Sequence, residues 1–143
     1  MAEQPKYYWT ERATRAIADA GKSSTSAGSE QLLRSLIRVS GMAAEVLRRC
    51  GVDLAAMMDA IEQCINDPAA SGLEPSEQPT IIEGIKRGAR AEAQTLRHNF
   101  TGTEHLLLSI LSGESSHARE ILLKFKVDYA LAHEKTLKVM YGE

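Results

Sequence analysis

The sequence predicts an all-α protein in which two pseudo-symmetric four-helix repeats pack into one domain. The first observation is a recurring tetrad, Gly-Ser-Glu-Gln at residues 28–31 and Gly-Thr-Glu-His at residues 102–105, whose glutamates lie 74 positions apart (104 minus 30). The second is that each tetrad opens an apolar run with helical spacing. The third is that no segment alternates in a strand pattern. A sequence unit that occurs twice in the chain is stronger evidence for the fold than any single residue.

The first repeat, residues 7–65, is expected to form four short helices. Small polar residues mark the helix starts, because their side chains accept hydrogen bonds from first-turn N–H groups. Glycine marks a helix end, because it tolerates the left-handed backbone found there. The expected helices cover residues 11–20, 29–39, 42–50 and 53–65, with Thr10, Ser29 and Asp53 as caps and Gly51 following the third helix.

The second repeat, residues 79–141, is expected to follow the same order after a linker at residues 66–78, which is rich in proline, glycine and small polar residues. A unit of this size buries its apolar faces poorly alone, so we expect the two units to pack together about a pseudo-twofold axis. The first helix of this repeat is expected to run from Pro79 or Thr80 to about Arg97, and three more are expected to start near Thr103, Ser115 and Asp128.

Composition excludes several classes of protein. The 143 residues carry a net charge of −2, which is not the basic surplus of a general nucleic-acid binder. No apolar run is long enough to cross a membrane, and residues 1–9 lack the apolar core of a secretory signal. Cys50 and Cys64 fall in helical segments, where we expect buried free thiols, as in a reducing compartment. The expected location is therefore the cytoplasm, with no nucleic-acid or membrane partner.

No motif in the chain supports catalysis. Residues 21–23 (Gly-Lys-Ser) resemble the end of a P-loop, but Ala16 stands where that motif needs glycine, and no strand precedes it. The four histidines lie in no metal-ligand motif, and structural roles are expected for His98 and His105. No Gly-x-Ser-x-Gly nucleophile motif occurs. We therefore expect no enzyme activity, no metal and no cofactor.

Glu30 and Glu104 lie in the first turn of their predicted helices, where two interpretations stay open. The simpler one is a stabilised helix start, in which glycine allows the turn, Ser29 or Thr103 caps the helix and the helix dipole favours a carboxylate. The other is a ligand site, because a carboxylate grips a guanidinium and free N–H groups hold a phosphate. A modified arginine offers both groups at once.

These residues resemble the Clp N-terminal domain, the double-repeat domain that precedes the ATPase rings of ClpA, ClpC and ClpB unfoldases. The ClpC type is the most similar. The most specific string is Arg-His-Asn-Phe-Thr-Gly-Thr-Glu-His-Leu-Leu-Leu at residues 97–108. The first repeat carries Trp-Thr-Glu-Arg-Ala at 9–13, the tetrad with two leucines at 28–33 and Gly-Val-Asp-Leu at 51–54. The resemblance covers about residues 7–141.

The resemblance implies a non-catalytic module that docks protein substrates or adaptors for an ATP-dependent Clp unfoldase–protease. The motif glutamates resemble sites that bind phosphoarginine in ClpC-type domains, together with the threonine that opens each repeat. Carried over, these are Thr10 with Glu30, and Thr80 with Glu104. The alternative is a free-standing regulator or decoy without ATPase rings, which binds the Clp protease ring or its adaptors. An isolated domain of this kind is expected to be monomeric.

Both expected pockets depart from the family pattern. The first repeat is several residues short before its tetrad, which ends in Gln31 rather than histidine. The second repeat lacks the usual arginine in its opening segment, and Gly84 and Gly88 are expected to weaken its first helix by roughly 1 kcal/mol each relative to alanine. If one pocket binds, the sequence favours the pocket with Glu104.

Overall fold

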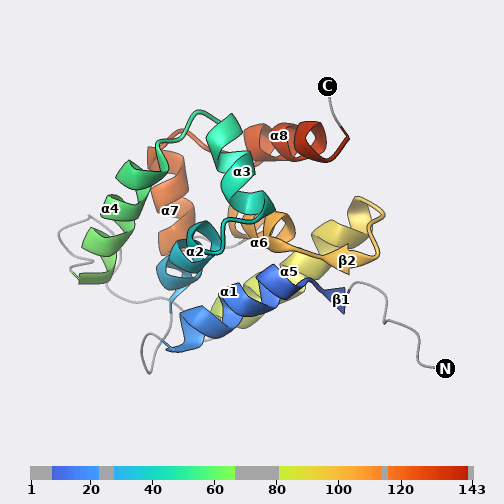
Figure 1. The fold of residues 1–143 in the computed structure, drawn as a ribbon, viewed down its shortest axis with the longest axis horizontal. Helices are drawn as coiled ribbons and strands as arrows, with labels where there is room; N and C mark the ends of the chain where they lie inside the picture. Colours follow the sequence, from blue (N-terminus) through green and yellow to red (C-terminus); the bar gives the residue numbers. More distant parts are fainter. Residues whose placement is uncertain (1–7, 23–27, 67–80, 114–115, 142–143) are drawn as a thin grey trace.

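Helices dominate the computed structural model, which describes residues 8–22, 28–66, 81–113 and 116–141 (Figure 1). The all-α class is confirmed. Most of the predicted linker, together with Pro79, Thr80 and Ser115, lies outside the described residues. The elements in chain order are β1 (Tyr8–Trp9), α1 (Glu11–Lys22), α2 (Ser29–Arg38), α3 (Met42–Arg49), α4 (Leu54–Asn66), α5 (Ile81–Thr95), β2 (Phe100–Thr101), α6 (Thr103–Ser112), α7 (His117–Lys124) and α8 (Tyr129–Tyr141).

Local signals explain where these helices begin and end. Thr10 Oγ1 accepts a hydrogen bond from the Ala13 N–H at 3.2 Å, and the Asp53 carboxylate accepts one from the Ala55 N–H at 3.0 Å. Both residues are therefore the N-caps that the sequence predicts. Gly51 has a φ of +90° just after α3, as predicted for a helix C-terminus.

One short pairing departs from the expectation of no strand. The two-residue strands β1 and β2 run parallel, with Tyr8 beside Phe100 and Trp9 beside Thr101. The Thr10 N–H extends the pairing with a hydrogen bond to the Thr101 carbonyl at 2.9 Å. Strands of two residues are too short to show the alternation that marks a strand in a sequence. The pairing brings the start of the first repeat against the second repeat.

The two repeats are interleaved rather than stacked. The third helix of the first repeat, α3, packs mainly against α6 and α8 of the second repeat. Its counterpart α7 packs mainly against α2 and α4 of the first repeat, as Figure 1 shows. The third helix of each repeat therefore packs mainly against helices of the other repeat. As a result, residues from both repeats lie side by side where these helices begin.

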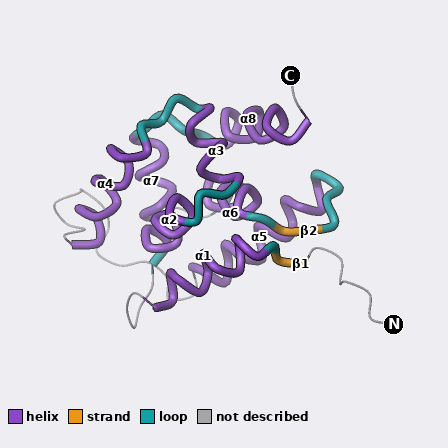
Figure 2. The backbone as a smooth tube through the Cα atoms, viewed as in Figure 1, coloured by secondary structure: helices purple, strands orange, loops and turns teal. Residues whose placement is uncertain are grey.

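The core lies around α2 and α6, which run through the middle of the molecule (Figure 2). Helix α6 is buried from Thr103 to Leu111, as expected for a helix that is apolar on nearly all sides. No helix among the described residues is both long enough and apolar enough to cross a membrane. The fully buried leucines of these two helices are Leu32, Leu33, Leu36, Leu106, Leu107 and Leu108.

Candidate functional site

The two tetrads begin α2 and α6 in the same way. Gly28 and Gly102 are the N-cap residues, and both have extended backbone. Gln31 Oε1 accepts a hydrogen bond from the Gly28 N–H at 3.0 Å, and His105 Nδ1 accepts one from the Gly102 N–H at 2.8 Å. The last residue of each tetrad thus holds its helix start in place, as in a capping box. Glutamine and histidine are interchangeable in this role because each offers an acceptor to the N-cap N–H.

Ser29 and Thr103 do not cap their own helices, so the capping role expected for them is wrong. Ser29 Oγ instead accepts a hydrogen bond from the Ala118 N–H at 2.9 Å. Thr103 Oγ1 accepts one from the Ala43 N–H at 3.1 Å. Ala118 lies in the first turn of α7 and Ala43 in the first turn of α3. Each repeat therefore supplies a capping hydroxyl to the helix that the other repeat has inserted beside it.

A pocket of about 360 Å³ lies where α1, α3 and α6 begin. A helix N-terminus carries partial positive charge and unpaired N–H groups. Three of them at one pocket therefore favour a negatively charged group. The pocket contains apolar side chains as well as charged ones. The lining residues are Thr10, Glu11, Arg12, Met42, Phe100, Thr103, Glu104 and Met140.

Glu104 lies in the first turn of α6 and lines this pocket. Its carboxylate folds back over Gly102, where a Cβ atom would collide with Glu104 Oε1. The residue is only 3% exposed. Burial raises the pKa of the Glu104 carboxyl, while a hydrogen bond from its own backbone N–H acts in the opposite direction. Glycine at position 102 therefore leaves the space in which this carboxylate sits.

Arg12 and Glu11 bring further charge to the pocket from α1. Arg12 Nη1 donates hydrogen bonds to the Val39 and Ser40 carbonyls, both at 2.8 Å, just beyond the end of α2. Glu11 forms an exposed ion pair with Arg15 at 3.0 Å. The pocket thus combines a fixed guanidinium, a buried carboxylate and three helix starts. A ligand that carries both a cation and an anion matches this combination.

Glu30, the other motif glutamate, does not line this pocket. Its Oε2 lies 3.2 Å from His117 Nδ1, at the start of α7. This pocket contains Thr10 together with Glu104, and the pairing of Thr10 with Glu30 that the resemblance implies stays a prediction. The expected pairing of Thr80 with Glu104 involves a residue outside the described part of the chain.

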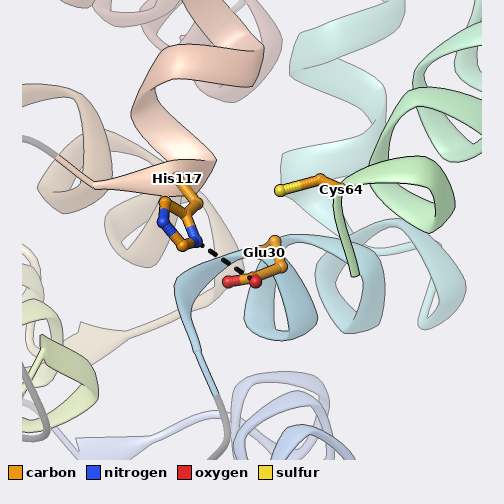
Figure 3. Close-up of side chains that lie close together, drawn as sticks. All are labelled: Glu30, Cys64 and His117. Carbon is orange, nitrogen blue, oxygen red and sulfur yellow. Dashed lines mark hydrogen bonds and ion pairs between the residues drawn. The ribbon is translucent and has the colours of Figure 1, made fainter. Parts of the chain in front are cut away.

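Glu30 and His117 also lie beside Cys64 in a buried cluster that comes from α2, α7 and α4 (Figure 3). The three residues are far apart in the sequence, so no ligand motif revealed them. Neither Cys64 nor Cys50 forms a disulfide, as predicted. Cys50, however, is only half-buried.

His98 and His105 form a hydrogen-bonded chain that ends at Tyr141. Because His105 Nδ1 accepts the Gly102 N–H, its Nε2 carries the proton and donates to His98 Nδ1 at 2.8 Å. His98 Nε2 then donates to Tyr141 Oη at 2.9 Å. Burial, with a smaller contribution from His98, lowers the pKa of His105 to about 4. Burial also lowers the pKa of His98. Both imidazoles are therefore neutral at pH 7. In this form His105 supports the start of α6 directly and His98 supports it through His105, in line with the structural roles expected for them.

Comparison with known families shows that a family model matches most of the chain. The model of the "Clp repeat (R) N-terminal domain" matches residues 8–88 and 83–140. A probable ATP-dependent Clp protease ATP-binding subunit from Chlamydia pneumoniae is 33% identical over 119 residues, which cover 78% of this chain and 13% of that protein. The chloroplastic chaperone protein ClpC3 from Oryza sativa subsp. japonica is 30% identical over 139 residues, which cover 92% of this chain and 15% of that protein. The chain thus spans a small part of the length of these relatives.

Solved structures with the same fold include two N-terminal domains. That of Hsp104 from Candida albicans gives a TM-score of 0.69 at 12% identity, covering 95% of this chain and 93% of the other. That of the chaperone ClpD from Arabidopsis thaliana gives a TM-score of 0.65 at 19% identity, covering 99% of this chain and 100% of the other. At these identities, the likeness establishes the fold.

Proposed function

The chain belongs to the Clp repeat N-terminal domain family, and we propose that it is a docking module for protein substrates or adaptors of an ATP-dependent Clp unfoldase–protease. We assign it no catalysis of its own. Support comes from the family match and from a pocket suited to a charged group on a protein partner. The curated relatives include an ATP-binding subunit of the Clp protease and a Clp chaperone.

The ligand that we propose for the pocket is phosphoarginine displayed on a protein. The observation that carries this proposal is the meeting of three helix starts around Glu104. Helix starts and Arg12 attract the phosphoryl group, and a carboxylate forms bidentate hydrogen bonds with the guanidinium. Free arginine lacks the first interaction and inorganic phosphate lacks the second, so neither alone fills both parts of the pocket.

Binding requires a movement of Glu104. Its carboxylate now accepts a hydrogen bond from its own N–H, at the helix start that a phosphoryl group would use. An arriving phosphoryl group takes over that N–H, and the carboxylate turns toward the ligand guanidinium. The carboxylate loses one hydrogen bond and gains a charged partner, which favours the exchange.

The proposal places Thr10 and Glu104 in one site. Glu30 has a different environment, because His117 pairs with its carboxylate. Thr80 lies outside the described residues, so the pairings that the resemblance implies, Thr10 with Glu30 and Thr80 with Glu104, stay predictions.

Calorimetric titration with free phosphoarginine tests the ligand. We expect binding to the wild-type chain and at least a tenfold loss of affinity in Glu104→Gln, which keeps the side-chain shape but removes its charge. Glu30→Gln is the matched control and should retain binding at the Glu104 pocket. Arginine and inorganic phosphate should each bind much more weakly. An absence of heat with millimolar phosphoarginine, or unchanged affinity in Glu104→Gln, contradicts the proposed ligand.

The docking role has its own test. The folded chain serves as bait in a native lysate, and mass spectrometry identifies the captured proteins. Recovery of Clp adaptors, or of arginine-phosphorylated proteins that wild type retains better than Glu104→Gln, supports docking. Recovery of the Clp protease ring without adaptors or substrates supports the free-standing regulator instead.

A further inference from the structure

Glu30, Cys64 and His117 bring three different ligand atoms together at a junction of the two repeats. A carboxylate oxygen, the thiol sulfur and an imidazole nitrogen all lie within 4.8 Å of one another. Figure 3 shows the sulfur and the imidazole ring beside the Glu30 carboxylate. The residues come from α2, α4 and α7, which pack against one another. This cluster is separate from the pocket that contains Glu104.

The cluster is closed to solvent and incompletely satisfied. Glu30, His117 and Cys64 are 8%, 6% and 0% exposed. Glu30 Oε2 is paired with His117 Nδ1, but Glu30 Oε1 has no hydrogen-bond partner among the described residues. A buried carboxylate oxygen without a partner is costly. The site therefore favours an additional positively charged group that both carboxylate oxygens can contact.

We propose that these three side chains bind one zinc ion. Zinc accepts sulfur from cysteine, nitrogen from histidine and oxygen from glutamate. Two nitrogen or oxygen ligands about 2.0–2.1 Å from a tetrahedral zinc lie about 3.3 Å apart, and the Nδ1–Oε2 distance here is 3.2 Å. A sulfur about 2.3 Å from the metal lies about 3.6 Å from each of them. A small rotation of the Cys64 side chain from its present position, within 4.8 Å of the other two ligand atoms, completes the set.

The charges of the bound state also balance. Zinc binding displaces the thiol proton of Cys64 to solvent and forms a zinc–sulfur bond. The resulting thiolate and the Glu30 carboxylate carry two negative charges, which match the two positive charges of the ion, while His117 binds as a neutral imidazole. A neutral assembly suits a buried position, where an uncompensated charge would be strongly unfavourable. Glu30 Oε1, which lacks a partner, can contact the ion beside Oε2, and a water molecule can complete the tetrahedron as the fourth ligand.

Bound zinc would join α7 of the second repeat to α2 and α4 of the first. It would also separate the roles of the two motif glutamates, with Glu30 holding a metal and Glu104 facing a ligand. This inference is independent of the proposed docking function, because it uses different residues and its test requires no partner protein.

Metal binding is tested on the 143-residue chain after removal of metals with a chelator. Zinc is titrated in competition with a chromophoric chelator, and cobalt serves as the spectroscopic probe. We expect one zinc per chain, a higher thermal midpoint with zinc, and cobalt spectra with tetrahedral d–d bands and a thiolate-to-cobalt charge-transfer band. A chain that takes up no stoichiometric zinc at equimolar metal overturns the proposal, whatever happens in any variant.

Two matched pairs of variants locate the site. Cys64→Ser should abolish the charge-transfer band and weaken zinc binding by at least about 100-fold, whereas Cys50→Ser should leave both unchanged. His117→Gln should weaken zinc binding similarly, whereas His133→Gln should not. Circular dichroism shows which variants are folded. Loss of the band in Cys50→Ser, or its survival in folded Cys64→Ser, overturns the assignment.

Discussion

The hydroxyl of Ser29 in the first repeat accepts a hydrogen bond from the backbone N–H of Ala118 in the second repeat, at 2.9 Å. Thr103 makes the counterpart of this bond with the Ala43 N–H at 3.1 Å. Both hydroxyls are buried, and both bonds satisfy N–H groups in a first helical turn that have no partner within their own helix. The exchange of α3 and α7 between the repeats is thus secured by one capping hydroxyl from each side.

Removing either hydroxyl should destabilise the whole domain rather than one helix. We expect Ser29→Ala and Thr103→Ala each to lower the free energy of unfolding by about 1–2 kcal/mol, because each leaves a buried N–H without its acceptor. Urea denaturation followed by circular dichroism measures the loss. Thr103→Ser keeps the hydroxyl and is the control, with an expected cost well below that of alanine. Equal stability of Thr103→Ala and Thr103→Ser would rule out the hydroxyl as the stabilising group.

The two glycines of α5 should respond in opposite directions to alanine. A Cβ on Gly88 would collide with Ser109 Oγ, which donates a hydrogen bond to the Ile85 carbonyl at 2.7 Å. Gly88→Ala should therefore destabilise the protein by about 1–3 kcal/mol, in spite of the better helix propensity of alanine. At Gly84 the nearest atom is Arg87 Nη2 at 4.0 Å, so Gly84→Ala should stabilise it by up to about 1 kcal/mol. Thermal and urea unfolding of both variants measure the difference.

A second substitution tests the cause of the Gly88 effect. Ser109→Ala removes the atom that the new methyl group meets, so it should cost less in the Gly88→Ala background than in wild type. A Gly88→Ala protein that is as stable as Gly84→Ala would show that α5 and α6 are not in close contact at this position. From the sequence alone both glycines are expected to weaken the helix alike, whereas the structure leads us to expect a gain from alanine only at Gly84.

The positions of the helices were predictable from the sequence because their signals are local. Thr10, Asp53 and Gly51 act within a few residues of their own positions, and their cap types identify helix ends. The partner of Ser29 lies 89 residues away, so helical periodicity and turn chemistry carry no information about it. The interleaving of α3 and α7 therefore could not be read from the pattern.

The candidate site was predictable only as two glutamates. The recurring tetrad indicated that Glu30 and Glu104 occupy equivalent helix starts, and the structure agrees. Their surroundings differ because other parts of the chain reach them. Glu104 shares its pocket with Thr10 from the opposite repeat, while Glu30 meets His117 and Cys64. Long-range packing determines both environments, and the local patterns of a single sequence do not reveal such packing.

Acid should destabilise this domain through His105. Its pKa lies near 4 in the folded protein and at the ordinary value of 6.5 when exposed, so the unfolded chain binds more protons between those values. The contribution of His105 to the free energy of unfolding is therefore fully present above about pH 6.5 and falls as the pH drops toward 4. The expected loss between pH 7 and pH 4 is on the order of 3 kcal/mol. Urea unfolding midpoints measured at intervals from pH 7 to about pH 4 record this loss.

His105→Gln isolates this effect. Glutamine accepts the Gly102 N–H in the way that Gln31 accepts the Gly28 N–H, but it does not titrate. The variant should lose a measurable part of the acid sensitivity, although His98, whose pKa is also lowered, continues to contribute. The raised pKa of Glu104 acts in the opposite sense in both proteins, so the difference between them reports the imidazole. The same pH dependence in wild type and variant would exclude His105 as the source.

Lys126 should be replaceable by glycine with a gain in stability. It follows α7 with a φ of +66°, at the position that corresponds to Gly51 after α3, whose φ is +90°. The next N–H in each case bonds back to the helix, from Val127 to the Leu122 carbonyl and from Val52 to the Leu47 carbonyl, which is the Schellman pattern.

A residue with a Cβ is strained at this position by roughly 1–2 kcal/mol, while glycine costs about 0.5–1 kcal/mol in backbone entropy. Lys126→Gly should therefore raise the free energy of unfolding by about 0.5–1 kcal/mol, and the reverse control Gly51→Ala should lower it by a similar amount. Urea denaturation at neutral pH measures both, and a loss of stability in Lys126→Gly would mean that the lysine side chain contributes more than the strain it introduces.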